Sequence, residues 1–232
     1  MPHKVKWLGH AACQITTAGG RVILIDPWIT GNPCCPIKKD DIGKIDAILV
    51  THDHFDHLGT DIPELVRATG AVVIAQPELA SALQKAGVGA ENIINGIGMN
   101  IGGQVEAAGV KVIMTQAFHS GTAGNAVGYI VVLEDGKTVY HAGDTGIFAS
   151  MELLGKIYHI DLALLPIGSV FVMDPLQAAY SLTLLKPDKV IPIHYATFPV
   201  LVQDADEFIK LAGEKAPEVQ VEALQPGQEV IL

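Results

Sequence analysis

Short apolar stretches recur along the chain, and each of them ends at a turn signal. Runs of about four to eight aliphatic or β-branched residues bounded by turns predict buried β-strands. Eight such runs cover residues 22–25, 47–50, 71–75, 110–114, 128–133, 137–140, 162–165 and 190–193.

Two helix starts stand between these runs. At Asp61-Ile-Pro-Glu64 the aspartate predicts a cap, the proline suits the first turn, and Glu64 completes a capping box before a helix that ends at Gly70. Asp174-Pro175 opens a second helix that reaches Leu185. Strands that alternate with helices predict an α/β fold.

The two halves of the chain repeat this pattern in outline. Residues 5–26 form a strand, turn, strand pattern around Gly19-Gly20, and residues 104–119 open the second half with a similar segment around Gly109. Each half then continues into strand–helix units. The pattern favours a four-layer αββα sandwich built from two pseudo-repeated halves, in a single domain that spans residues 1–232.

Composition and charge narrow the function. With 49% hydrophobic residues, 17% charged residues and 24 glycines, the chain is typical of a packed fold. A net charge of -10 without a basic stripe argues against a nucleic-acid partner. No run approaches about 18 apolar residues, and the start lacks a secretory signal, so we expect no membrane partner and a cytoplasmic protein. Cys13, Cys34 and Cys35 fit neither a disulfide framework nor a zinc ribbon, and we expect reduced thiols that bind no metal.

The strongest chemical signal is the HxHxDH motif formed by residues 52–57, directly after an apolar run. Chance would produce it with odds on the order of one in a thousand. In an extended loop His52 and His54 point the same way, whereas the neighbours Asp56 and His57 diverge and could reach a second site. One loop could therefore serve two divalent metal ions. Mixed nitrogen and oxygen ligands favour zinc, with manganese, nickel or iron(II) as alternatives.

Three further candidate ligands follow apolar runs: His119, Asp144 and His194. Each alone would more often be a packed core residue. Together with the loop they form a coherent set, because ligands at strand ends from both halves can meet at one edge of a sandwich. His10, after the first apolar segment, is a further candidate, whereas His141 is more typical of a packing residue or a partner of a ligand.

Four motifs carry a family resemblance: Trp-Leu-Gly-His-Ala from Trp7, Asp-Pro-Trp-Ile-Thr-Gly-Asn-Pro from Asp26, Val-Thr-His-Asp-His-Phe-Asp-His-Leu-Gly from Val50, and His-Ala-Gly-Asp-Thr-Gly from His141. Over nearly its whole length the chain resembles the metallo-β-lactamase superfamily, and in detail its UPF0173 branch of metal-dependent hydrolases. UlaG-type lactonases and N-acylphosphatidylethanolamine phospholipase D are similar at a greater distance.

The resemblance implies a division of the ligands. One metal ion would be held by His52, His54 and His119, the other by Asp56, His57 and His194, with Asp144 between them as a bridge. It also places His10 beside the metals, as a donor to the substrate or as a partner of a ligand. The β-lactamases of the superfamily usually lack counterparts of His57 and Asp144, so lactam hydrolysis is disfavoured.

Such a centre predicts a binuclear metal-dependent hydrolase. Two ions about 3.5–4 Å apart lower the pKa of a shared water towards about 7, and the bridging hydroxide attacks the substrate. Asp56 would pass the proton to the leaving group. Two ions balanced by Asp56, Asp144 and hydroxide leave a charge of about +1, which favours a small anionic ester, a phosphodiester or a lactone.

Two alternatives stay open at this point. The first is a metal-binding protein of the same fold without turnover. The second is a nuclease like the tRNA-processing members of the superfamily, which is disfavoured because the chain has neither a basic stripe nor a long inserted arm. The chain could also form a homo-oligomer.

Overall fold

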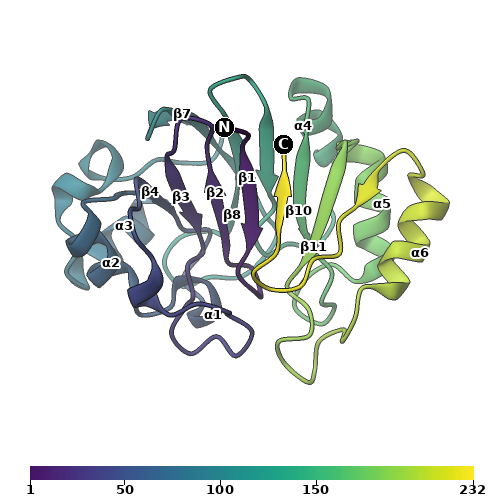
Figure 1. Ribbon diagram of the computed structural model, residues 1–232, viewed down its shortest axis with the longest axis horizontal. Coiled ribbons are helices and arrows are strands. Elements are labelled where there is room, and N and C mark those ends of the chain that lie inside the picture. The colour runs from purple at the N-terminus through teal and green to yellow at the C-terminus, as the bar shows by residue number, and fades with distance from the viewer.

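Two β-sheets form the centre of the protein, and the helices cover their outer faces (Figure 1). The computed structural model describes residues 1–232. The first sheet has the order β13 (Glu229–Ile231), β1 (Lys4–Trp7), β2 (Cys13–Thr16), β3 (Val22–Ile25), β4 (Ala47–Leu49) and β5 (Val72–Ile74). The second has the order β12 (Gln220–Val221), β11 (Lys189–Ile193), β10 (Leu162–Pro166), β9 (Thr138–His141), β8 (Val127–Val132), β7 (Val110–Gln116) and β6 (Gln104–Ala107). All eight predicted strands are present, with ends that shift by at most two residues.

The helices lie in two groups, one on each side of the sheets (Figure 1). On the side of the first sheet are α2 (Ile62–Thr69) and α3 (Pro77–Lys85), whose apolar faces pack on side chains such as Leu24 and Ile48. On the side of the second sheet are α4 (Met151–Ile157), α5 (Pro175–Leu185) and α6 (Asp206–Lys215). A separate core of 47 buried residues combines side chains of both sheets, so the layers follow the predicted αββα order. Short helices complete the chain: α1 (Phe55–Leu58), η1 (Lys39–Asp41), η2 (Ala90–Asn92) and η3 (Ile94–Gly96).

The helix caps agree with the sequence in one case and differ in the other. Asp174 caps α5, because its Oδ1 accepts a hydrogen bond from the backbone N–H of Gln177 at 2.7 Å. The predicted capping box of α2 is wrong: Asp61 has a helix-like backbone and makes no cap bond. Its buried carboxylate instead accepts from the backbone N–H of Thr30 at 2.8 Å, so a tertiary contact replaces the local one.

The pseudo-repeat is present, but its alignment differs from the predicted one. In the first half β1, β2 and β3 pair antiparallel and β3, β4 and β5 pair parallel. In the second half β7, β8 and β9 pair antiparallel and β9, β10 and β11 pair parallel. The repeat therefore equates β1 with β7, not with the segment that starts at residue 104. In sequence, residues 5–26 and 104–119 both read as two strands around a glycine turn, and only the strand pairing shows that they are not equivalent.

This topology brings the loops that follow β3, β4, β9 and β11 to one edge of the sandwich, near α1 (Figure 1). Both chain termini lie at the opposite edge, where the backbone N–H of Leu232 donates to the carbonyl of His3 at 3.0 Å. None of the helices is long and apolar enough to span a membrane. The three cysteines are free thiols.

Candidate metal centre

The HxHxDH loop leaves β4 and enters the single turn of α1. His54 occupies the cap position of α1 with an extended backbone, and Asp56 and His57 lie within the turn. His52 and His57 are buried, whereas Asp56 keeps 14% of its side chain exposed. The change from extended loop to helix turns the second half of the motif away from the first. Two separate groups of ligands therefore arise from six consecutive residues.

The first group contains three imidazoles. Nε2 of His52 lies 3.0 Å from Nδ1 of His54, and Nε2 of His119 lies 3.2 Å from the same atom. Ligands of one tetrahedral zinc ion with Zn–N bonds of about 2.0–2.1 Å are separated by about 3.4 Å, so the spacing suits a shared ion. Burial is the main cause that lowers the pKa of His52 to about 3, and it also lowers the pKa of His119. Both rings are consequently neutral at pH 7, the form that binds metal.

The second group combines Asp56 and His57 with His10 and His194, and their ligand atoms lie within 4.8 Å of one another. Nε2 of His10 is 3.2 Å from Oδ2 of Asp56, and the rings of His10 and His194 are 4.0 Å apart. Burial raises the pKa of Asp56, but the contact with His10 and the charge of His57 outweigh it and lower the pKa to about 2. Asp56 is therefore a carboxylate at neutral pH.

Asp144 lies between the two groups. Its Oδ1 is 3.2 Å from Nε2 of His57, and its Oδ2 is 3.0 Å from Nε2 of His194. The same Oδ2 is 3.6 Å from Nε2 of His119 and 4.0 Å from Nε2 of His52. Burial acts to raise the pKa of Asp144, but the surrounding histidines hold it well below its usual range. One buried carboxylate thus faces both groups.

Unpartnered atoms in the centre fit a bound cation. Nε2 of His57 and Oδ1 of Asp144 are buried without a hydrogen bond of good geometry, although they are close enough for an ionic contact. Buried polar atoms almost always have a partner, so two such atoms that face each other in one cluster are consistent with a bound cation. Imidazole nitrogen and carboxylate oxygen are donors that zinc and similar divalent ions take. The residues present therefore fit metal ions.

Comparisons with known proteins agree with this chemistry. Residues 21–195 match the family described as "Beta-lactamase superfamily domain". A UPF0173 metal-dependent hydrolase from Nitratidesulfovibrio vulgaris (strain DP4) is 48% identical over 232 residues, which cover 100% of this chain and 96% of that protein. The chain belongs to the UPF0173 family of the β-lactamase superfamily. A second UPF0173 metal-dependent hydrolase, from Caldivirga maquilingensis, is 47% identical over 224 residues, covering 96% of this chain and 95% of the relative.

Solved structures support the same fold. Igni18, a metallo hydrolase from the archaeon Ignicoccus hospitalis KIN4/I, is 38% identical with a TM-score of 0.89 and covers 100% of this chain and 99% of its own. The metallo-β-lactamase fold protein YhfI from Bacillus subtilis covers both chains fully with a TM-score of 0.75 at 15% identity, and it shows the fold alone. The chain is thus an enzyme of the metal-dependent hydrolase class, with histidine and aspartate clusters able to bind metal.

Asp26 supports the candidate metal centre of this UPF0173 hydrolase, and in the sequence it stands out only as part of the motif that starts at this residue. It follows β3 and is completely buried. Its Oδ1 accepts from the backbone N–H of Thr51 at 2.8 Å, while its Oδ2 accepts from the Thr51 hydroxyl at 2.6 Å and lies 2.7 Å from Nδ1 of His57. Because a carboxylate only accepts, Nδ1 of His57 carries a proton. Burial acts to lower the pKa of His57, but the carboxylates of Asp144 and Asp26 hold it well above its usual range, so without a metal ion Nε2 is protonated as well. A bound metal ion would displace this second proton and take the Nε2 lone pair, while Asp26 keeps the first proton on Nδ1. The one hint of this role is the position of the aspartate directly after the buried strand β3, which pairs with β4.

The same carboxylate reaches the other group through Thr51. Since the Thr51 hydroxyl donates to Asp26, its oxygen accepts from Nδ1 of His52, 3.0 Å away. This network assigns the proton of His52 to Nδ1 and leaves Nε2 free for a ligand. Burial opposes ionisation of Asp26, but the charge of His57 and its hydrogen bond lower the pKa of the carboxyl. Asp26 therefore orients one histidine in each group.

Asp53, inside the motif, ties down the loop that carries His119. Its carboxylate accepts from the backbone N–H of Thr122 at 2.9 Å and from the Thr122 hydroxyl. Gln76 supports the same loop, because its Oε1 accepts from the backbone N–H of Asn125 at 2.6 Å. The motif spacing gives no sign of this role of Asp53, because its partner lies 69 residues away along the chain.

His10 and His141 are both completely buried. Nδ1 of His10 lies 2.9 Å from the Thr197 hydroxyl, so the imidazole is held between that group and Asp56. In this position His10 fits a residue that holds the candidate ligand Asp56 better than one that donates a hydrogen bond to the substrate. Nε2 of His141 donates to the carbonyl of Ala11 at 2.9 Å and Nδ1 accepts from the backbone N–H of Gly143, a structural role like the one expected.

Backbone strain concentrates around this centre. His10, Asp26 and His194 have left-handed φ values of 55°, 48° and 59°. Ser169 and Val170, in the loop after β10, also have positive φ, and a left-handed β-branched residue is a rare outlier. Strain of this kind costs about 1–3 kcal/mol per residue and persists where the surrounding structure enforces it, most often at functional sites.

A cavity of about 390 Å³ opens over the centre. Phe55 and Phe171 project at its rim and are largely exposed, and no lysine or arginine lines it. The lining residues are His54, Phe55, Asp56, His119, Ser120, Asp144, Phe171 and His194. A substrate can therefore reach the ligands from solvent past apolar side chains.

Proposed function

We propose that this enzyme is a binuclear metal-dependent hydrolase of a small anionic ester, a phosphodiester or a lactone. The observation that carries the proposal is the position of Asp144, with one carboxylate oxygen toward His57 and the other toward His194, His119 and His52. A carboxylate in this position can join two ligand groups into one centre.

In this proposal His52, His54 and His119 hold one ion, Asp56, His57 and His194 hold the other, and Asp144 contacts both. Zinc is the favoured metal, with manganese, nickel or iron(II) as alternatives. Bound divalent ions would polarise the scissile bond and activate a water molecule at neutral pH. The charge balance of the centre, near +1 in that state, favours an anionic group on the substrate.

The chain's own residues prepare this chemistry. Asp26 presents the Nε2 lone pairs of His52 and His57 to the centre, and His10 holds Asp56 from its buried side. Asp56 is the carboxylate nearest to solvent, and with a pKa of about 2 it starts the reaction ionised. Its low basicity suits ligation, while transfer of a proton from Asp56 to the leaving group stays a prediction.

Elemental analysis of protein purified without added metal, combined with a substrate panel, tests the proposal. We expect two divalent ions per chain and hydrolysis of bis-p-nitrophenyl phosphate or of simple lactones that a chelator abolishes. An enzyme fully loaded with metal that leaves the whole ester panel intact would support the alternative of a binding protein without turnover. Hydrolysis that survives complete removal of metal would refute the mechanism.

A further inference from the structure

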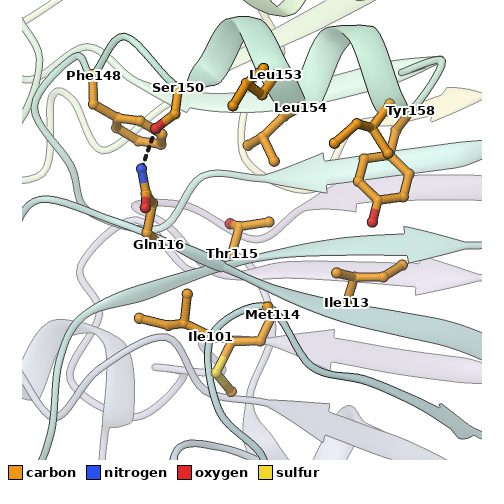
Figure 2. Close-up of a pocket in the computed structure, with 12 residues that line it drawn as sticks. Ile101, Ile113, Met114, Thr115, Gln116, Phe148, Ser150, Leu153, Leu154 and Tyr158 are labelled. Carbon is orange, nitrogen blue, oxygen red and sulfur yellow. Dashed lines mark hydrogen bonds between the residues drawn. The ribbon is translucent and has the colours of Figure 1, made fainter.

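A second cavity lies between α4 and strand β7 (Figure 2). Its volume is about 340 Å³, at the lower end of ligand pockets, which range from about 300 to 1,000 Å³. We call it the α4 groove. Its lining is mostly apolar: Ile101, Gly102, Ile113, Met114, Thr115, Gln116, Phe148, Ser150, Leu153, Leu154, Ile157 and Tyr158.

The groove adjoins the catalytic cavity. Gln116 lines the groove and His119 lines the catalytic cavity, and three residues of chain span at most about 10 Å. Phe118 lies between them, with its ring centroid 5.4 Å from that of Phe148 in the groove. Although 62% exposed, Phe118 is fixed through its backbone, which bonds to Thr145 and Gly146. Phe118 therefore places an exposed apolar side chain between the loop that carries His119 and the Phe148 end of the groove.

Neither the α4 groove nor the catalytic cavity is lined by lysine or arginine, so no cationic side chain there pairs with a second anionic group of a substrate. The polar side chains at the Phe148 end satisfy each other, because Nε2 of Gln116 donates to the hydroxyl of Ser150 (Figure 2). Leu153 and Ile157 nevertheless stay largely exposed along the outer wall. Exposed apolar side chains that line a groove next to a reaction centre indicate an apolar occupant.

We propose that the substrate is an amphiphile, whose anionic ester group reacts at the metal centre and whose alkyl chain lies over Phe118 in the α4 groove. This inference rests on the proposed function for the identity of the reacting group, and it adds the chemical class of the rest of the substrate. The alkyl phosphodiesters and the lactones with an alkyl side chain belong to this class, whereas nucleotides and sugar phosphates do not.

Binding of alkyl phosphates to the metal-loaded enzyme tests the groove without turnover. Calorimetry with butyl, hexyl, octyl and decyl phosphate should show a dissociation constant that falls about fourfold per added methylene once the chain passes Phe118. Leu153→Asp places a charge in the groove and should weaken the binding of decyl phosphate at least about tenfold more than the binding of butyl phosphate. Ile209→Asp is the matched control, because Ile209 is 41% exposed on α6 and lines neither cavity.

Turnover gives a second reading. For p-nitrophenyl alkyl phosphates, kcat/KM should rise with chain length in the unchanged enzyme and in Ile209→Asp, and the rise should disappear in Leu153→Asp. Affinity and kcat/KM that do not depend on chain length, or equal losses in both variants, would overturn the inference while leaving hydrolysis intact. A chain-length gradient in binding without any hydrolysis would support the groove and reject the proposed function.

Sedimentation velocity tests the alternative that a second copy of the chain, rather than an alkyl chain, occupies the α4 groove. If the protein is a dimer that Leu153→Asp dissociates, and alkyl phosphates bind without regard to length, the groove is an interface and the inference is wrong. An unchanged oligomeric state together with the chain-length gradient supports the alkyl chain as occupant.

Discussion

Replacing Asp26 by asparagine isolates the effect of proton placement, because the two side chains have nearly the same shape. The Oδ1 of Asp26 accepts from a backbone N–H, so in Asp26→Asn the amide oxygen must stay there. The amide nitrogen then replaces Oδ2 and donates to Nδ1 of His57 and to the oxygen of Thr51. This reverses both donations that Oδ2 accepts in the unchanged protein.

The reversal moves two protons. With Nδ1 accepting, neutral His57 carries its proton on Nε2, the atom that faces Asp144. The Thr51 hydroxyl is released to donate to Nδ1 of His52, which moves that proton to Nε2 as well. One ligand of each group would be blocked. Loss of an outer partner of a metal ligand typically costs about 10–100-fold in metal affinity or activity, or about 1.4–2.7 kcal/mol.

Competition with a chromophoric chelator measures the metal affinity, and hydrolysis of bis-p-nitrophenyl phosphate measures the activity. Asp46→Asn is the control: Asp46 also accepts from a strand N–H, that of Val22, but it lies at the far end of β4. We expect the affinity to fall at least about tenfold in Asp26→Asn and to stay unchanged in Asp46→Asn. Unchanged affinity at both sites in Asp26→Asn would show that the carboxylate does not set the tautomers, and equal losses in the two variants would indicate a folding effect.

Three further predictions follow from the same centre. Asp144→Ala should abolish the stoichiometry of two metal ions and nearly all hydrolysis; elemental analysis that still finds two ions would show that Asp144 is no bridge. In metal-free protein, burial lowers the pKa of His10 to about 4 and that of His52 to about 3, and the unfolded chain therefore takes up more protons below about pH 6.5. The free energy of unfolding should then decrease as the pH falls from about 6.5 through about 4, by up to about 1.4 kcal/mol per pH unit for each histidine, and denaturant titrations that show no such decrease would contradict the burial argument. Gly143→Ala would place a Cβ 2.4 Å from the carbonyl oxygen of Val127, whereas the Cβ of Gly109→Ala, at a similar positive φ, would meet no atom within 4 Å. Only Gly143→Ala should lower the metal content. In thermal unfolding, Gly143→Ala should also lose more stability than the roughly 1–2 kcal/mol that a left-handed backbone costs.

The strands were predictable because their burial is nearly uniform along each run. Strands β10 and β11 pair parallel in the middle of the second sheet, and such strands consist of continuous apolar residues. The edge strands β6, β12 and β13 escaped separate prediction, since half of their positions or more face solvent and pairing alone defines them. The same reason explains the misaligned repeat, in which β6 and β7 were equated with the first hairpin.

The candidate metal ligands were predictable by residue type, whereas the residues that support them were not. His119, Asp144 and His194 are chemically distinctive residues after apolar runs, and the sheet topology brings them to the HxHxDH loop. Asp26 and Asp53 act through partners 25 to 69 residues away. Their function depends on which strands pair and how loops fold back, and local residue patterns do not contain that information.

The pseudo-repeat places a histidine and an aspartate at equivalent positions of the two halves. His10 lies in the loop between β1 and β2, and His119 lies in the equivalent loop between β7 and β8. Asp26 follows β3, and Asp144 follows the equivalent strand β9. Each half thus contributes a histidine and an aspartate from the same topological positions, but with different work: His119 and Asp144 face the centre as ligand candidates, while His10 and Asp26 hold ligand candidates from behind. Only the first half adds the HxHxDH loop after β4. The equivalent loop after β10 carries no candidate ligand; it contains the strained Ser169 and Val170 and brings Phe171 to the rim of the cavity, to which the ligand loop contributes Phe55.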